Sequence, residues 1–548
     1  MFRKQSFWKG SALLLASAMI AKLLGACFKI PLTNVLGGTG MGYFSTAYGL
    51  LLPVYALSVT GLSAAVAQTV SRAAALEHWA EVRRIRDTAR LACGVLGLFL
   101  SLCMFLLAEP FAALVAAQPY ALFSLLGCLT AVERGYWEGL QNMTPTAVSQ
   151  ALEAVAKLGL GLALCQWVLA HPEIVCRRVP ADVPLSALAA AGAVLGVTLS
   201  TAVGWLYFLL RGLRSGNRLP RGNAPAAPMG QIFRRLLYVM IPVALGSLVT
   251  NLTSLLDLVT MMRCLGRAQM LHSGELLRRF GTAASAPDFP AFVYGSFTGM
   301  AITVFNLVPS VTNMLGKSAL PCAAALWAKQ DREGVVAHIR SVTGAAAAMA
   351  LPAAGGLWAL AEPVMHILYA GRPEEAAIAA EALRTLLPGM VCLCLTFPLC
   401  SILQGVGKAA VPVVCMLAGV GVKLLGNLVL IPRPAFCITG AGIATSLCYL
   451  VLLGLILWQL RRCLEKPLHL MRTLLPIVLA AGYCTAAAWF CREQTAALGM
   501  LPSAAAAAAG GCLVYLAVLY LLVLRRRKQT GSIPLNKGKQ TAESAPER

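Results

Sequence analysis

Long apolar stretches recur from one end of the chain to the other, separated by short polar segments. Each has about 20 residues or more, the length that an α-helix needs to cross a hydrocarbon core about 30 Å thick. The pattern therefore predicts fourteen membrane-spanning helices, at 9–32, 41–70, 88–108, 111–133, 146–170, 184–210, 236–263, 292–316, 334–361, 383–407, 410–431, 438–460, 472–491 and 502–524.

Composition agrees with this pattern. The 548 residues are 58% hydrophobic and 12% charged, whereas a soluble domain has about 25% charged residues. We predict an all-α polytopic membrane protein. The start of the chain resembles a signal peptide, with Ala16, Ser17 and Ala18 at the cleavage position. Because the apolar run continues to Leu32, an uncleaved first helix is the better prediction.

The distribution of positive charge predicts the orientation. With the N-terminus inside, 31 of the 45 Lys and Arg residues fall in cytoplasmic segments, 10 in outer loops and four within helices. This bias predicts an even number of spans in the cytoplasmic membrane, with both termini cytoplasmic. The net charge of +23 is spread over short loops, which argues against nucleic acid as a partner.

Loop composition divides the chain. The loop at 211–235 is rich in Gly, Pro and Arg and reads as a linker. We therefore expect an N-terminal lobe of six helices, a linker, a C-terminal lobe of six helices, two further helices and a disordered cytoplasmic tail. Their limits are 1–215, 216–235, 236–463, 464–526 and 527–548.

A weak internal repeat relates the two sets of six helices. At an offset of 266 residues, Gly139 aligns with Gly405 and Lys157 with Lys423, and two leucines that follow also match. Six spans per set is an even number, so both sets run in the same direction. This predicts a parallel pseudo-two-fold repeat about an axis along the membrane normal, a design found in transporters.

Ionisable residues inside the predicted helices are the main candidates for function. A charge at the centre of a spanning helix costs about 2.5–3.5 kcal/mol and usually faces a bundle interior or a watery cavity. Lys22 and Lys29 share a face of the first helix. Glu153 and Lys157 are four residues apart and can pair. Lys423 has no acidic neighbour in sequence, but Asn427 follows four residues later.

Polar faces on two other helices extend this set. The seventh helix carries a polar stripe that ends at Asp257, and the eighth carries another. With the lysines of the first helix they predict a wet central cavity that binds substrate. Proline within a span bends it and frees a carbonyl group, so two prolines at matching points are predicted hinges. The residues are Lys22, Lys29, Asp257, Asn306, Ser310 and Asn313 for the cavity, and Pro53 and Pro309 for the hinges.

Several of these residues keep alternative interpretations. Asp257 could be structural, could pair with Lys22 or Lys29, or could bind a coupling ion, Na⁺ or H⁺. The pair of Glu153 and Lys157 could simply lock its helix, and the side chain of Lys29 could reach the outer interface. The acidic residues Glu374, Glu375 and Glu381, in the predicted outer loop before the tenth helix, are expected to be solvated and replaceable.

No motif for catalysis is present. The 18 cysteines include no CxxC pair, the six histidines form no HExxH, and no GxxxxGK[ST] loop occurs. We therefore expect neither a metal site nor ATP hydrolysis, and no enzyme activity or cofactor.

Three segments resemble a known family. They are GTGMGYFSTAYGLLLPVYALSVTGLSAAVAQTVS (38–71), GLQNMTPTAVSQALEAVAK (139–157) and LQGVGKAAVPVVCMLAGVGVKLLGNLVLIP (403–432). The chain resembles the stage V sporulation protein B group of the multidrug/oligosaccharidyl-lipid/polysaccharide exporter (MOP) superfamily. The resemblance implies two lobes in a V that open alternately to either side, and a groove for a lipid tail beside the last two helices.

The MurJ-type relatives in this superfamily flip lipid II and carry cations in the first helix near a Leu-Gly pair. Here AKLLGACFK places Lys22 before Leu24 and Gly25, where those relatives more typically have arginine. The resemblance implies a monomeric flippase that moves an undecaprenyl-diphosphate-linked oligosaccharide or peptidoglycan precursor, with membrane lipid and that substrate as partners.

Two rival functions are considered. A cation-coupled multidrug exporter of the same superfamily would favour an acidic cavity. Here the predicted helices contain four lysines and only two acidic residues deep in the membrane, Glu153 and Asp257. A scaffold without transport activity would leave the buried cations unexplained.

Overall fold

The computed structural model describes residues 7–55, 61–115, 125–176, 183–215, 227–408 and 410–530, and the described part is helical without strands. The helices of the first half of the chain are α1 (Phe7–Tyr55), α2 (Gly61–Ala75), α3 (Trp79–Val115), α4 (Leu125–Gly139), α5 (Thr144–Ala170), α6 (Pro172–Cys176) and α7 (Leu185–Ser215).

The second half begins with α8 (Met229–Leu271) and continues through α9 (Ser273–Phe280), the short η2 (Gly281–Ser285), α10 (Phe289–Gly295), the π-helical η3 (Ser296–Ala301), α11 (Ile302–Phe305), α12 (Leu307–Ala328), α13 (Arg332–Leu368), α14 (Pro373–Gly405), α15 (Ala410–Leu430) and α16 (Cys437–Leu464). After it come α17 (Leu470–Gln494), η4 (Ala496–Leu498) and α18 (Met500–Thr530).

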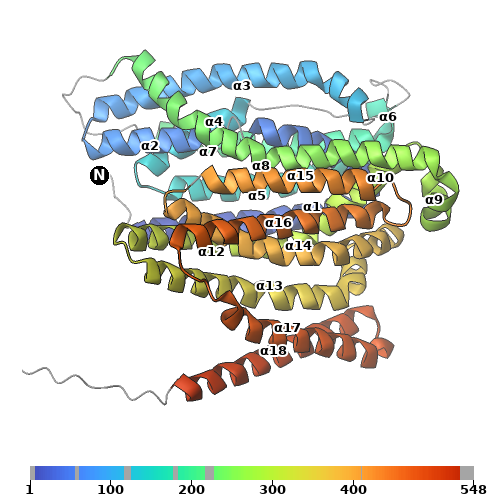
Figure 1. The fold of residues 1–548 in the computed structure, drawn as a ribbon. Coiled ribbons are helices and arrows are strands. Elements are labelled where there is room, and N and C mark those ends of the chain that lie inside the picture. Colours follow the sequence, from blue (N-terminus) through green and yellow to red (C-terminus); the bar gives the residue numbers. More distant parts are fainter. Residues whose placement is uncertain are drawn as a thin grey trace, which may run out of the picture.

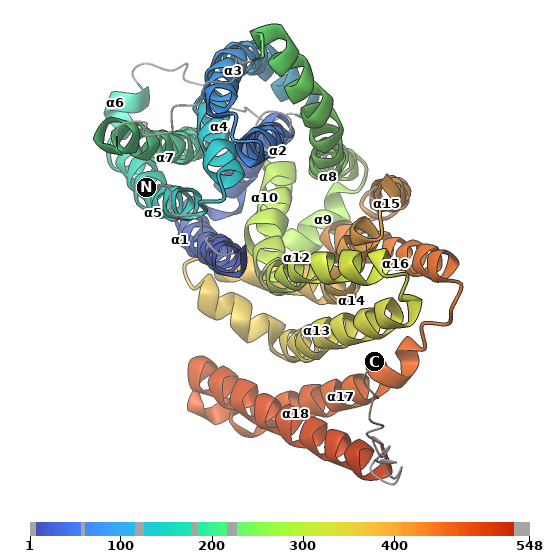
Figure 2. The ribbon, with the colours of Figure 1, turned by 90° about the vertical axis from the view of Figure 1, so that its left-hand side faces the viewer.

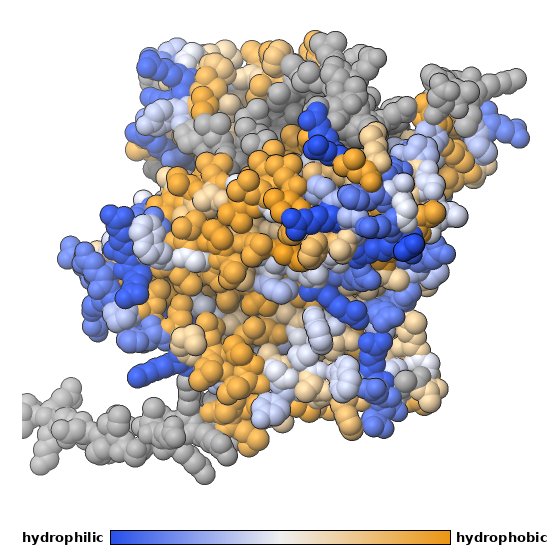
Figure 3. Space-filling model, turned by 45° about the vertical axis from the view of Figure 1, so that its right-hand side comes forward, coloured by the Kyte–Doolittle hydropathy of each residue, from blue (hydrophilic) through white to orange (hydrophobic). Residues whose placement is uncertain are grey.

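The membrane character predicted from hydropathy is confirmed. Nine helices in the described ranges are long and apolar enough to cross a membrane, or ten if the bent pair Phe289–Phe305 and Leu307–Gly316 forms one span. Large apolar side chains such as Leu98, Val155 and Leu425 are more than half exposed. Figure 3 shows apolar side chains in a band across the middle of one face, between hydrophilic ends. The count of fourteen spans stays a prediction.

The first two expected helices are joined by a sharp turn inside α1. This stretch consists of two helices that meet at Gly37, where φ is +67°, and the rings of Phe28 and Phe44 on either side of the turn lie 6.0 Å apart. The break therefore falls within the loop expected at 33–40. This left-handed value favours glycine because a side chain there meets its own backbone. Pro53 lies near the end of α1, and its side chain is outside the described part of the structure.

The eighth expected helix is broken rather than straight. Its two parts differ in direction by 47° at a break next to Asn306. Pro309 lies three residues further on and has no N–H to donate to the carbonyl of Phe305. A bend at this point is what that missing hydrogen bond favours.

The helices run roughly parallel, and α1 lies between the two halves of the chain (Figure 1). It packs against α5 and α7 from the first half and against α10 and η3 from the second half. The helices α17 and α18 lie together beyond α13 (Figure 2). The start of α1 and the end of α18 lie at the same end of the stack (Figure 1), as expected for an even number of crossings.

Candidate functional site

Lys22 makes one contact between the two halves of the chain. Its Nζ, on α1, donates to the Oγ of Ser310 on α12 at 3.4 Å. A small cavity of about 30 Å³ at this point is lined by Met19, Lys22, Leu23, Leu307, Ser310 and Val311. Asn306 is exposed one turn before Ser310, and Asn313 is half-buried. Thus two of the predicted cavity residues meet, and they do so across the boundary between the halves.

Lys157 lies against aromatic rings of α1. Its Nζ is 3.5 Å from the hydroxyl of Tyr48, 5.0 Å from the centre of that ring and 5.3 Å from the centre of the Phe28 ring. Phe44 stacks on Tyr48 with ring centres 5.7 Å apart. The faces of aromatic rings attract a cation, so this cluster stabilises the ammonium group without neutralising it.

Lys29 adds a second positive charge to the same region, within electrostatic reach of Lys157. Neither lysine forms an ion pair with a carboxylate in the described part of the chain. Two nearby cations without a counter-ion repel each other strongly where the dielectric constant is low. The arrangement favours the arrival of an anion.

The expected pair of Glu153 and Lys157 is not formed. Glu153 Oε2 instead accepts from Arg134 Nη2 at 2.5 Å, and its Oε1 accepts from Thr201 Oγ1 at 3.4 Å. The i, i+4 spacing permits a pair but does not exclude a stronger partner on a neighbouring helix. Arginine offers several donors and a delocalised charge, and Arg134 is mostly buried and lies close enough to take the carboxylate.

Sequence reasoning missed this arginine and a second ionic network beside it. Glu133, buried in α4, accepts from Arg86 at 2.6 Å and lies 2.5 Å from Arg90 at the closest approach, both on α3. The available signal was the adjacent pair Glu133 and Arg134 at the end of a predicted span. It was missed because charges at the end of a span usually mark the membrane interface.

Asp257 pairs with Lys423 and not with a lysine of α1. The two side chains form an ion pair, and Asn427 Nδ2 donates to the other carboxylate oxygen of Asp257 at 3.0 Å and to Thr260 Oγ1 at 3.1 Å. Lys423 and Asn427 are buried. The expected pairing with Lys22 or Lys29 is therefore wrong. Both oxygens of Asp257 are occupied by protein donors, which disfavours a coupling-ion site there.

The predicted outer end of the two halves is held together by hydrogen bonds to α1. The backbone N–H of Gly38 donates to Glu375 Oε2 at 2.9 Å, and Asn34 Nδ2 donates to the carbonyl of Leu368 at 2.9 Å. A side chain on Gly295 would lie 1.8 Å from the Gly38 carbonyl oxygen, so the backbones touch directly. The halves are closed at this end.

The expectation that all three outer acids are solvated is wrong for one of them. Glu375 is 8% exposed and accepts the Gly38 hydrogen bond. Glu374 is exposed, and Glu381 is about half exposed beside Arg279 at 2.9 Å. Position at the start of α14 did not reveal that the first turn of this helix meets the bend in α1.

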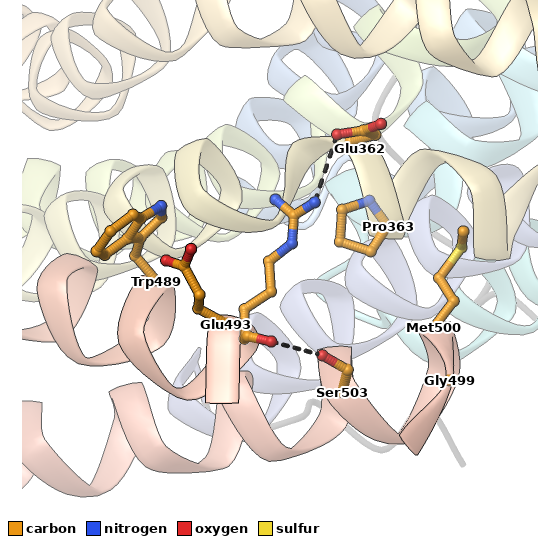
Figure 4. A pocket seen from close by; sticks show the side chains of 8 residues that line it. Glu362, Pro363, Trp489, Glu493, Gly499, Met500 and Ser503 are labelled. Carbon is orange, nitrogen blue, oxygen red and sulfur yellow. Dashed lines mark hydrogen bonds and ion pairs between the residues drawn. The ribbon is translucent and has the colours of Figure 1, made fainter. Parts of the chain in front are cut away.

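A separate cavity of about 560 Å³ lies between the end of α13 and the pair α17 and α18 (Figure 4). In it Arg492 donates to Glu362 at 3.4 Å, and Ser503 donates to the carbonyl of Arg492 at 3.2 Å. None of the residues predicted for the central cavity lines it.

No group of three or more His, Cys, Asp or Glu side chains that could hold a metal ion occurs within the described ranges.

Comparisons with known proteins place this arrangement in a family. The family model described as polysaccharide biosynthesis protein matches residues 7–321, more than half of the chain, and the MatE model matches residues 296–429. Stage V sporulation protein B of Bacillus subtilis (strain 168) is 23% identical over 451 residues, 80% of this chain and 81% of that protein. Lipid II flippase MurJ of the same organism is 22% identical over 497 residues, 86% of each chain.

Solved structures share the fold. An inward-facing multidrug resistance MATE transporter of the MOP superfamily superposes with a TM-score of 0.60 at 14% identity, covering 83% of this chain and 99% of the transporter. Lipid II flippase MurJ in an inward closed conformation gives 0.53 at 12% identity, covering 95% and 99%. The chain therefore belongs to the polysaccharide biosynthesis protein family and is a multi-pass membrane protein with the fold of the MOP superfamily transporters.

Proposed function

We propose that this protein is a flippase that moves a lipid-linked oligosaccharide or peptidoglycan precursor, carried on undecaprenyl diphosphate, across the cytoplasmic membrane. The observation that carries the proposal is the charge balance at the boundary between the halves. Lys22 donates a hydrogen bond to Ser310 across this boundary. Lys29, on α1, and Lys157, on α5, have no carboxylate partner in the described chain. A diphosphate headgroup supplies the anion that such cations attract, and a low dielectric strengthens the attraction.

The two intramembrane acids support the same substrate class. Glu153 is engaged by Arg134, and Asp257 by Lys423. A cation-coupled exporter of cationic drugs would need an available carboxylate, so the paired state of both acids favours an anionic substrate over that alternative. The named activity of the relative lipid II flippase MurJ supports a lipid-linked substrate. Peptidoglycan precursor is the leading candidate.

The proposed cycle alternates access between two lobes, residues 1–215 and 236–463. In the structure the predicted outer ends are joined by the Gly38–Glu375 and Asn34–Leu368 hydrogen bonds. Release of the headgroup to the outside requires these contacts to separate while the prenyl tail stays in lipid. An inside-negative potential favours outward movement of an anion by about 2.3 kcal/mol per charge per 100 mV.

The orientation belongs to the proposal and has its own test. Both termini and the 216–235 linker are proposed to be cytoplasmic. In a variant whose native cysteines are replaced by serine, a cysteine introduced at Ser215 should resist a membrane-impermeant maleimide in intact cells and react after permeabilisation. Labelling in intact cells would reverse the orientation.

The substrate site is tested at Lys22. Lys22→Ala should abolish flipping, because a headgroup phosphate loses its counter-charge, while Lys22→Arg should keep substantial activity. Lys29→Ala should be milder. The measurement is accessibility of the lipid-linked headgroup in proteoliposomes, with thermal unfolding of each variant measured in parallel. Lys408→Ala, an exposed lysine at a helix end, is the matched control.

Normal flipping by Lys22→Ala would remove Lys22 from the substrate site. A loss of flipping together with a large loss of thermal stability would make Lys22 a structural residue.

A further inference from the structure

The corner between α16 and α17 holds two adjoining cavities that the proposed transport site does not use. Their volumes are about 440 and 750 Å³, within the usual range for ligand sites. Both are lined by Trp458, Arg461 and Pro467. The corner is formed where α16 ends at Leu464 and α17 begins at Leu470.

The two cavities differ in chemistry. The smaller is completed by Arg462, Glu465 and Lys466, so charged side chains dominate its lining. The larger is completed mainly by apolar side chains, including Leu457, Leu470, Met471 and Leu474. A charged compartment that opens beside an apolar one matches a molecule with a polar head and a hydrocarbon chain.

Two arginines are available in the charged compartment. Glu465 is already paired with Arg332 at 2.7 Å, and Lys466 with Glu333 at 2.7 Å. Arg461 and Arg462 are exposed, and neither pairs with a carboxylate within the described residues. The guanidinium of Arg462 lies 5.6 Å from the centre of the Trp458 ring, which orients it.

Arginine is the side chain best suited to phosphate, because its planar fork donates two parallel hydrogen bonds. Basic pockets between membrane helices bind the headgroups of anionic lipids. The exposed apolar side chains of α17 near the corner, Met471 at 73% and Leu475 at 53%, extend the surface available to a chain.

From these observations we infer that the α16–α17 corner binds a lipid phosphate. Arg461 and Arg462 hold the phosphate, Trp458 borders the headgroup, and the chain enters the apolar compartment beside Leu470 and Leu474. The ligand is a phosphate ester on a lipid, which could be an anionic phospholipid or a prenyl phosphate. The site lies outside the boundary where Lys22 meets Ser310, and its occupancy is measured without transport.

The test is binding of defined lipids to the purified full-length protein by native mass spectrometry, with thermal stabilisation as the second readout. The probes are phosphatidylglycerol, undecaprenyl phosphate, phosphatidylcholine and inorganic phosphate. The double variant Arg461→Gln with Arg462→Gln should bind phosphatidylglycerol at least about tenfold more weakly. Arg461→Lys with Arg462→Lys should lose less, because the charge remains.

The matched control is Arg267→Gln with Arg278→Gln, which removes two exposed arginines elsewhere. It should bind phosphatidylglycerol as the wild type does. Equal binding of phosphatidylglycerol and undecaprenyl phosphate indicates a general lipid-phosphate site, and a preference for the prenyl ester indicates a substrate entrance; both support the inference.

Three results would overturn the inference. They are unchanged phosphatidylglycerol binding by the Arg461→Gln, Arg462→Gln variant, equal loss in the control variant, and displacement of the lipid by inorganic phosphate at similar concentration. Thermal unfolding in lipid-free detergent shows whether the variants are folded before binding is compared.

Discussion

Lys157 and Lys423 occupy the same position in the predicted repeat and have opposite electrostatic surroundings. Each lies against the first long helix of its own half, Lys157 against α1 and Lys423 against α8. Lys423 meets the carboxylate of Asp257, whereas Lys157 meets the rings of Phe28 and Tyr48 and lies near Lys29. Lys423 is buried and neutralised by a carboxylate, whereas Lys157 is half-buried and is not neutralised.

The difference indicates two uses for one residue type. A buried ion pair with additional hydrogen bonds is expensive to break, because either partner alone is a buried unpaired charge. A cation held only by aromatic rings keeps its net charge and can attract a mobile anion. We therefore expect Lys423 to contribute to stability and Lys157 to contribute to the electrostatic field of the proposed substrate path.

Removing the acid of the C-terminal half should give the largest effect. Asp257→Ala leaves Lys423 buried without a counter-ion and should lower the free energy of unfolding by about 3–5 kcal/mol. Thermal unfolding in detergent measures this loss. The double variant Asp257→Asn with Lys423→Met should recover most of it. A single Asp257→Ala variant as stable as the wild type would show that the pair contributes nothing to stability.

Replacing Glu153 in the N-terminal half should test whether Lys157 lacks a carboxylate partner. Glu153→Ala should cost about 3 kcal/mol, because it removes the carboxylate that balances the charge of the mostly buried Arg134. A double-mutant cycle should show coupling of Glu153 to Arg134 and little coupling to Lys157. Coupling to Lys157 of more than about 1 kcal/mol would restore the pair predicted from spacing and remove the contrast between the halves.

Replacing the cation of the N-terminal half should have a smaller effect of the opposite sign. Lys157→Met removes a charge that costs about 2.5–3.5 kcal/mol in a span and loses two cation–π contacts of about 0.5–1 kcal/mol each. We expect a gain in stability of about 1 kcal/mol with reduced flipping. A clear loss of stability would mean that Lys157 is structural, like Lys423.

The smallest effect is expected from the hydroxyl nearest to Lys157. Tyr48→Phe keeps the ring and removes an oxygen 3.5 Å from Nζ, a distance at which a hydrogen bond contributes little. The free energy of unfolding should change by less than about 0.5 kcal/mol. A larger loss would show that the hydroxyl, and not the ring, holds the ammonium group.

The helical, membrane-spanning character of the chain followed from the sequence because apolar runs of spanning length are a local property. The positions of most helices also followed from the sequence, for the same reason. For example, α5, α15 and α16 begin within two residues of the predicted limits. The local pattern also placed the turn between the first two helices, because the break at Gly37 falls within the expected loop at 33–40.

The list of intramembrane charges also came from the sequence alone. The cost of burying a charge marks Lys22, Lys29, Lys157, Lys423 and Asp257 as residues that need an explanation wherever they lie. Their partners were decided by tertiary structure. An ion pair depends on which helices are neighbours and how each is rotated, and no spacing along one helix contains that information. Because α4 packs on α5, Glu153 pairs with Arg134, and because α8 packs on α15, Asp257 pairs with Lys423.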